Sequence, residues 1–224
     1  MRRSQEVWRG PMSSDGRKGG NGGPEGGVTE RGEAKRRIED AAVRLFARRG
    51  FVSSSVREIA EAAGVTKPTV YYYFGSKVGL GLAIVEEAQR KVEDYIAEET
   101  GGKTDVVERL VGFAMAHYRG CSENRDLAQF LYGLSFSPVE SDLTLDVRRF
   151  RKGAMDALDR ILDDAVAEGV IRPEAREEAH LLFMGSVNIH MMASLRFDLE
   201  LSRELAERSV RLFLEGVGTR VGED

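Results

Sequence analysis

Residues 53–77, which read SSSVREIAEAAGVTKPTVYYYFGSK, contain two short helical patterns with a glycine between them. Ser55 and Glu58 have the spacing of a capping box, in which each side chain accepts a hydrogen bond from the other's backbone, so a helix is predicted to begin there. Gly64 suits the left-handed conformation that ends many helices. Small and apolar residues repeat at helical spacing in between: Val56, Ile59, Ala60 and Ala63.

A second helix is predicted after Thr66, whose side chain can cap it, and Pro68 fits the first turn because a missing N–H costs nothing there. Val70 and Phe74 supply an inward side, which leaves polar and aromatic residues on the other faces. Such a helix after a small-residue helix and a glycine turn is typical of a helix-turn-helix, whose second helix enters the major groove of DNA. The spacing alone also allows an ordinary helical hairpin with surface tyrosines.

Four motifs follow one another around this stretch: LFARRGF at residues 45–51, SVREIAEAAGV at 55–65, TKPTVYYYF at 66–74 and SK at 76–77. Together they resemble the DNA-binding domain of the TetR (AcrR-like) family of bacterial transcriptional regulators, over about residues 35–80. The rest of the chain resembles the family only in length and helical pattern. The resemblance implies a regulator that binds a double-stranded DNA operator as a homodimer and responds to a small molecule.

By resemblance, the contacts to DNA come from the second helix and the start of the first: Ser54, Ser55, Arg57, Lys67, Pro68, Thr69, Tyr71, Tyr73 and Lys77. In physical terms, Pro68 and Thr69 can touch thymine methyl groups, and Lys67 can read a guanine edge. Tyrosine hydroxyls and the Lys77 ammonium can reach phosphates. Tyr72 is left out of this set because it can pack inward.

The charge of the chain is distributed unevenly. The 224 residues carry a formal net charge of −4. Residues 33–78 hold nine basic and five acidic groups, a balance of +4, whereas residues 79–224 hold eighteen and twenty-eight, a balance of −10. A basic head on an acidic body directs phosphate contact to one end of the molecule.

Composition predicts a cytoplasmic protein that is associated with the nucleoid when it is bound to DNA. The chain has no apolar run long enough to span a bilayer and no signal-peptide pattern at its N-terminus. Its single cysteine, Cys121, cannot form an internal disulfide. His117 lies four residues before it, but two ligands do not make a zinc site, so no metal, cofactor or catalytic residue is predicted.

The periodicity predicts an all-α fold of about nine helices in two domains. Residues 1–32 are glycine-rich and are expected to form a disordered tail, either an arm for the minor groove or, as we favour, a solubilising tail or an upstream extension. The helix-turn-helix domain is expected at residues 33–78 and a helical ligand-binding and dimerisation domain at 79–218. Helices are expected over residues 33–49, 55–63, 66–74, 76–95, 104–119, 123–136, 143–169, 173–197 and 202–216.

Gly79 and Gly81 fall in the first turns of the helix that joins the two domains. Glycine inside a helix costs about 1 kcal/mol relative to alanine. We therefore expect a soft start to this helix, which serves either to adapt the DNA-binding head to its operator or to absorb a ligand signal.

Aromatic and histidine residues at helical spacing form a candidate pocket for a largely apolar effector: Phe113, His117, Tyr118, Phe130 and His190. The same spacing is also that of a simple core. The two last helices are candidates for a twofold dimer interface, with Leu181, Met184, Asn188, Met192, Leu212 and Phe213 near their own counterparts. They can instead complete a monomer's core.

Three functional alternatives remain at this stage. The favoured function is a ligand-responsive repressor that binds an inverted-repeat operator. A related regulator would act as an activator or be controlled by a partner protein. A small-molecule carrier or enzyme on a helical bundle is the distant alternative, and the polar face of the second helix argues against it, since neither class needs such a face.

Overall fold

The computed structural model of the protein describes residues 25–135 and 152–218. Within these ranges the chain is helical, and the β pairing found there is a single bridge between Ile171 and Gly218. The predicted all-α fold is therefore confirmed. The nine α-helices described are α1 (Glu25–Arg49), α2 (Val56–Ala63), α3 (Lys67–Phe74), α4 (Lys77–Thr100), α5 (Val106–Glu123), α6 (Arg125–Ser135), α8 (Lys152–Ala167), α9 (Arg176–Phe197) and α10 (Arg203–Val217).

The helix caps predicted at the ends of α2 and α3 are present in the structure. The Ser55 hydroxyl accepts from the Glu58 N–H at 3.3 Å, and the Glu58 carboxylate accepts from the Ser55 N–H at 2.9 Å. Gly64 ends α2 with φ 66°, in the left-handed region. Thr66 then caps α3 by accepting from the Thr69 N–H. The capping box, the glycine turn and the second cap are thus confirmed.

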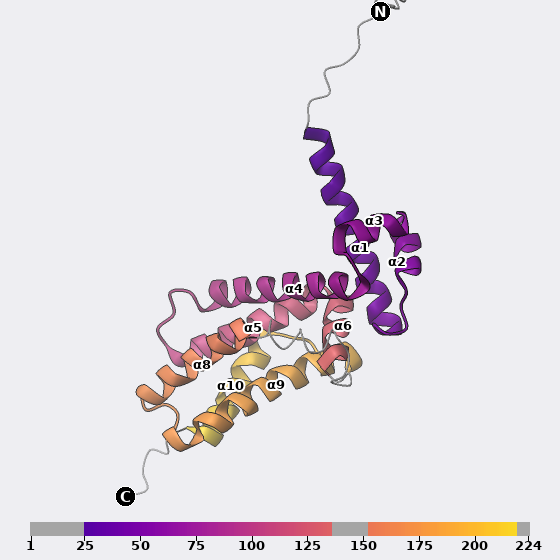
Figure 1. Cartoon of the computed structure of the whole chain (residues 1–224). Coiled ribbons are helices and arrows are strands. Elements are labelled where there is room, and N and C mark those ends of the chain that lie inside the picture. Colours follow the sequence, from indigo (N-terminus) through magenta and orange to yellow (C-terminus); the bar gives the residue numbers. More distant parts are fainter. Residues whose placement is uncertain (1–24, 136–151, 219–224) are drawn as a thin grey trace, which may run out of the picture.

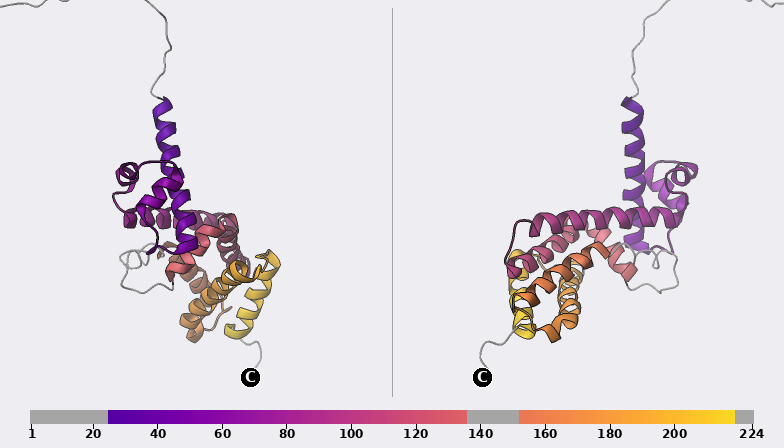
Figure 2. Two further views of the ribbon diagram at one scale, coloured as in Figure 1. Left: turned by 90° about the vertical axis from the view of Figure 1, so that its right-hand side faces the viewer. Right: turned by 60° about the vertical axis from the view of Figure 1, so that its left-hand side comes forward.

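Helix α1 begins earlier than the sequence suggests. It starts at Glu25, so residues 25–32, which were expected to belong to a disordered tail, are helical. Its N-terminal part extends beyond the other helices (Figures 1 and 2). Residues 1–24 of the expected tail lie outside the described residues.

The remaining helices form the body, with α4 running from the head across its top (Figure 1). Helices α4, α5, α8, α9 and α10 share one apolar core, in which Phe113, Leu158 and Phe183 are buried. The expected long helix over residues 143–169 is described from Lys152 to Ala167, and its first part lies outside the described residues. A 3-10 turn at Pro173–Ala175 precedes α9, and Ser202 caps α10 as predicted.

Helix α6 belongs to the core of the head rather than to that of the body. Phe130 and Leu134 are buried in the same cluster as the apolar faces of α1, α2 and α3. The rings of Phe46 on α1 and Phe130 lie 4.9 Å apart. The Gln129 side chain donates to the Ala47 carbonyl at 3.1 Å. One body helix therefore completes the core on which the helix-turn-helix is built.

The start of α4 is closely packed rather than soft. Ser76 caps the helix by accepting from the Gly79 N–H at 2.9 Å. A Cβ at Gly79 would overlap the carbonyl oxygen of Phe74, at the end of α3. Gly81 is buried. The expectation of a flexible first turn is corrected: Gly79 is required because two backbone segments approach closely there.

None of the helices in the described ranges is long and apolar enough to cross a membrane. In the same residues, no group of three or more His, Cys, Asp and Glu side chains is placed to hold a metal ion.

Replacing Gly79 with alanine is expected to lower the free energy of unfolding by about 1–3 kcal/mol, because overpacking against a backbone oxygen outweighs the gain in helix propensity. Urea unfolding of the full chain measures this. Gly133→Ala is the matched control, since Gly133 also lies in a helix, but a Cβ there has nothing within 4 Å. The control is expected to be neutral or stabilising. Equal stability of both variants would contradict the close-packing account.

Candidate functional site

Helix α3 presents a polar and aromatic face to solvent. Lys67 and Pro68 are exposed, and Tyr71 is 46% exposed. Tyr72 is 73% exposed, whereas Tyr73 packs partly against the core of the head. This is the reverse of the expectation, in which Tyr73 faces DNA and Tyr72 packs inward. Because adjacent residues differ by about 100° around a helix, Tyr72 lies on the same side as Pro68, four residues earlier, and Tyr73 turns toward Val70.

Lys77 is held inside the head instead of extending toward DNA. Its ammonium donates to the carbonyls of Phe51 at 3.0 Å, Val52 at 3.2 Å and Ser54 at 2.9 Å. It also lies 4.6 Å from the centre of the Phe51 ring. Burial lowers the pKa of this ammonium. The expected phosphate contact is corrected, since the donors of Lys77 already fix the start of α4 to the turn between α1 and α2.

The serines before α2 also have structural partners. Ser54 is 3% exposed and donates from its hydroxyl to the Gly50 carbonyl at 2.9 Å, so its side chain faces inward. The Ser55 side chain is engaged in the capping box. Arg57 is exposed and forms a loose pair with Glu61 at 3.8 Å. Of the three residues expected at the start of α2, Arg57 is therefore the one that has a long side chain available at the surface.

Thr69 and Thr66 share a hydrogen bond of 2.8 Å between their hydroxyl oxygens. Thr69 therefore supports the N-terminus of α3, and its methyl group is the part that can contact a base. The outward face of α3 consists of a lysine, a proline, this methyl group and two tyrosines. These groups can contact base edges and phosphates in a major groove.

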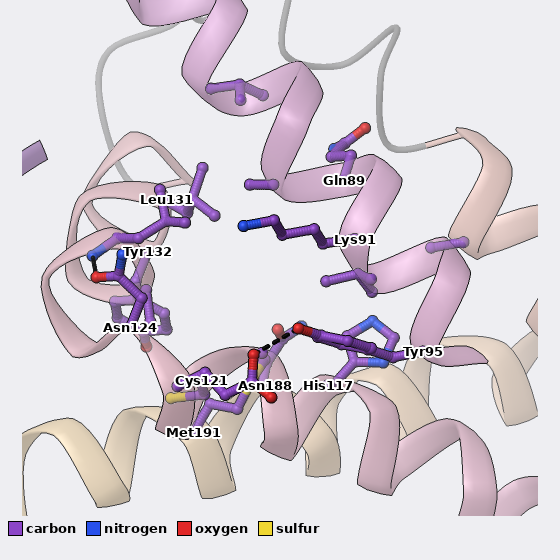
Figure 3. Close-up of a pocket in the computed structure, with 18 of the residues that line it drawn as sticks. Gln89, Lys91, Tyr95, His117, Cys121, Asn124, Leu131, Tyr132, Asn188 and Met191 are labelled. Atoms are coloured by element: carbon purple, nitrogen blue, oxygen red, sulfur yellow. Dashed lines mark hydrogen bonds between the residues drawn. The ribbon is translucent and has the colours of Figure 1, made fainter. Parts of the chain in front are cut away.

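A cavity of about 330 Å³ lies in the body between α4, α5, α6, α8 and α9 (Figure 3). Most of its wall is apolar, and the larger apolar residues are Val85, Val92, Leu127, Leu131, Met155, Met184, Met191 and Leu195. Polar groups lie among them: Gln89, Lys91, Glu93, Tyr95, His117, Glu123, Asn124, Tyr132 and Asn188. A size above 300 Å³ and a mostly apolar wall with a few polar groups are typical of small-molecule sites.

The structure separates the residues that were expected to form a pocket. His117 lines the cavity. Phe113 and Tyr118 are fully buried in the body core, and Phe130 is buried in the head core. His190 is half-buried, with its Nδ1 2.5 Å from the Tyr118 hydroxyl. Their spacing indicated an inward face correctly, but helical periodicity does not separate a cavity wall from a filled core.

The Tyr118–His190 pair is a partly buried polar contact between the core residue Tyr118 and the half-buried His190. Burial raises the pKa of Tyr118 to about 12 and lowers that of His190. Both groups are therefore neutral near pH 7, and the tyrosine hydroxyl and the imidazole Nδ1 serve as each other's hydrogen-bond partners.

The residues expected at a dimer interface also divide into two groups. Leu181 is 74% exposed and Leu212 is 61% exposed. Met192 is half-buried, and the half-buried Phe213 ring lies 5.2 Å from that of Phe183. Met184 and Asn188 instead line the cavity, because α9 has one side on the cavity and another in solvent. The dimer interface itself stays a prediction.

Known proteins resemble this chain over both of its parts. A family model described as bacterial regulatory proteins, tetR family, matches residues 38–84. The fatty acid metabolism regulator protein of Bacillus subtilis is 27% identical over 135 residues, which are 60% of this chain and 69% of that protein. The HTH-type transcriptional regulator AcrR of Shigella flexneri is 34% identical over 83 residues, 35% of this chain and 39% of AcrR.

Solved structures extend the resemblance to the body. The fatty acid degradation regulator FadR from Bacillus halodurans has a TM-score of 0.71 and 26% identity, over 81% of this chain and 98% of that one. FadR from Bacillus subtilis, solved in complex with stearoyl-CoA, has a TM-score of 0.72 over the same shares, and its 24% identity establishes a common fold only. These relatives are transcriptional regulators and not enzymes. With its helix-turn-helix matched by the family model, the chain belongs to the TetR family of bacterial regulatory proteins and is a transcriptional regulator.

Proposed function

We propose that the protein is a homodimeric repressor that binds an inverted-repeat operator and releases it when an effector occupies the cavity. The observation that carries this proposal is the placement of α6. One side of this helix lines the cavity through Leu127, Leu131 and neighbouring residues. Its Phe130 and Leu134 lie in the core of the DNA-binding head. A ligand that displaces α6 therefore acts directly on the packing of α1.

Helix α4 provides a second connection between cavity and head. Val85, Ala88 and Val92 of α4 line the cavity, and the first residue of the helix, Lys77, is bonded to the turn between α1 and α2. A ligand shifts the equilibrium between two dimer shapes only by the difference of its affinities for them. A shift from 1:99 to 99:1 takes about 5.5 kcal/mol of that difference.

The proposed effector carries an acyl chain. The apolar wall of the cavity suits such a chain, and relatives named as regulators of fatty acid metabolism and degradation support this class. Acting on chromosomal operators, the regulator would work in the cytoplasm, at the nucleoid.

Mapping of the protein's binding sites on its own genome, followed by titration of the recovered duplex, tests the function. The expected result is an inverted repeat with half-sites about one helical turn, or roughly 34–36 Å, apart. Acyl ligands should release it at micromolar concentrations. An activator would instead bind more tightly with the ligand present. Absence of any sequence preference would refute the proposal.

Lys67 and Tyr72 are expected to contribute to operator binding, whereas Lys77 is expected to contribute to stability. Lys67→Ala and Tyr72→Ala should each weaken operator binding by about tenfold while leaving the urea midpoint unchanged, because both side chains are exposed. Lys77→Met should lower the free energy of unfolding by about 1–3 kcal/mol, since three carbonyls lose their donor. If Lys77→Met left stability intact but flattened the salt dependence of binding by about one unit, the phosphate contact would be reinstated.

The dimer is expected to depend on the exposed apolar residues of α9 and α10. Leu181, Leu182, Ile189, Phe197 and Leu212 are each at least half exposed, an amount of apolar surface that favours a partner. Leu181→Glu or Leu212→Glu should shift the protein from dimer to monomer in sedimentation at micromolar concentration. Val52→Glu is the control, since Val52 is 81% exposed but lies in the head. If the wild-type protein sediments as a monomer, the proposed dimer is contradicted.

A further inference from the structure

A cationic side chain lies on the wall of the cavity. Among its described lining residues, Lys91 is the one lysine or arginine. The side chain leaves α4 and extends across the cavity toward the side of α6 that carries Leu131 and Tyr132 (Figure 3). Its side chain is 55% exposed and therefore reaches solvent, while the rest of the wall is mostly apolar.

Lys91 has a weak ion pair with the neighbouring carboxylate of Glu87. Its contact with Glu87 spans 4.0 Å, beyond hydrogen-bond distance. Glu87 is engaged more closely by Arg90, whose Nη2 donates to both carboxylate oxygens at 2.8 and 2.7 Å. The Arg90 hydrogen bonds lower the pKa of Glu87. This carboxylate therefore has a stronger partner than the ammonium of Lys91.

The two carboxylates on the cavity wall, Glu123 and Glu93, contact groups other than Lys91. Glu123 accepts from the Tyr95 hydroxyl at 2.5 Å and from Arg119 Nε at 2.9 Å. These bonds lower its pKa, so it remains ionised and paired. The Glu93 carboxylate lies against Gly153 of α8 and also lines a second cavity between α4, α5 and α8. Residues two apart on a helix differ by about 200°, so Glu93 and Lys91 leave α4 on different sides.

We propose that Lys91 binds the anionic head group of an amphipathic effector whose apolar chain fills the cavity. This inference rests on the proposed ligand response and adds the chemical class of the head group and the residue that recognises it. A cation at the opening of an apolar cavity pairs with an anion there while the chain loses its contact with water. The head group is a carboxylate in a free acid or a phosphate in an acyl-CoA thioester, and both are oxyanions that a lysine can bind.

The contact would also attach the ligand to the helix that joins the two domains. Lys91 lies on α4, whose first residue, Lys77, is hydrogen-bonded to the turn before α2. An anion that draws Lys91 inward therefore acts on α4, while the chain acts on α6. The head group and chain contribute separately, so their effects can be measured separately.

Equilibrium dialysis of the full chain with dodecanoic acid, dodecanoyl-CoA and uncharged dodecanol tests this. The wild type is expected to bind at least one of the anionic ligands about tenfold more tightly than dodecanol, as one charge-assisted hydrogen bond allows. Lys91→Met keeps the apolar stem and should remove this preference with little change for dodecanol. Lys91→Arg should restore it. Lys103→Met is the control, because Lys103 lies outside the cavity, and it should behave as the wild type.

The two anionic ligands identify the head group. If Lys91→Met weakens only dodecanoic acid, the partner is a carboxylate; if it weakens only dodecanoyl-CoA, the partner is a phosphate. Equal binding of all three ligands by the wild type, unchanged anion binding in Lys91→Met, or no binding of any ligand would overturn the inference. Operator release is measured in parallel with dodecanol. If dodecanol releases the operator and Lys91→Met does not change anion binding, the Lys91 contact is rejected. The proposal of a ligand-responsive regulator would then still hold.

Discussion

The packing of Phe130 against Phe46 is the contact on which the relation between the two parts of the molecule depends. Helices α1 to α3 are too short a segment to bury a large core alone, and small domains bury a smaller fraction of their surface. Phe130 and Leu134 of α6 supply the missing apolar surface. The helix-turn-helix is therefore built on a core that is shared with the body.

Helix α6 is also held at its other end. Arg125 donates to the Ser194 carbonyl of α9 at 3.0 Å, and Gln129 donates to the Ala47 carbonyl of α1 at 3.1 Å. Close-packed interiors move between discrete arrangements rather than deforming continuously. A ligand that requires more room in the cavity therefore has to shift α6 relative to α1 or to α9. A shift relative to α1 disturbs the core on which α3 is packed, which gives the proposed regulation a physical route.

Features that depend on near neighbours in the chain could be predicted from the sequence, and features that depend on the angle between helices could not. The Ser55–Glu58 box, the Gly64 turn and the Thr66 cap each involve residues within a few positions, and all were predicted correctly. Tyr72 and Tyr73 were assigned to the wrong sides of the helix, although Tyr73 follows the buried Val70 by three residues and that spacing indicates the inward side. Lys77 bonds to carbonyls more than twenty residues earlier, which no local pattern indicates. The cavity likewise depends on how five helices diverge, so the inward-facing Phe113 and Tyr118 lie in filled core, whereas Met184 and Asn188 line the cavity.

The junction between α3 and α4 shows how the same sequence feature can serve opposite purposes. A glycine early in a helix is read as flexible when only its propensity is considered. At Gly79 the missing side chain instead lets the backbone pass close to the Phe74 carbonyl, and Ser76 and Lys77 fix the same turn with hydrogen bonds. A joint that is packed on one side and bonded on the other has little freedom to bend. A displacement of α4 is therefore expected to reach the head rather than to be absorbed at the first turn of the helix.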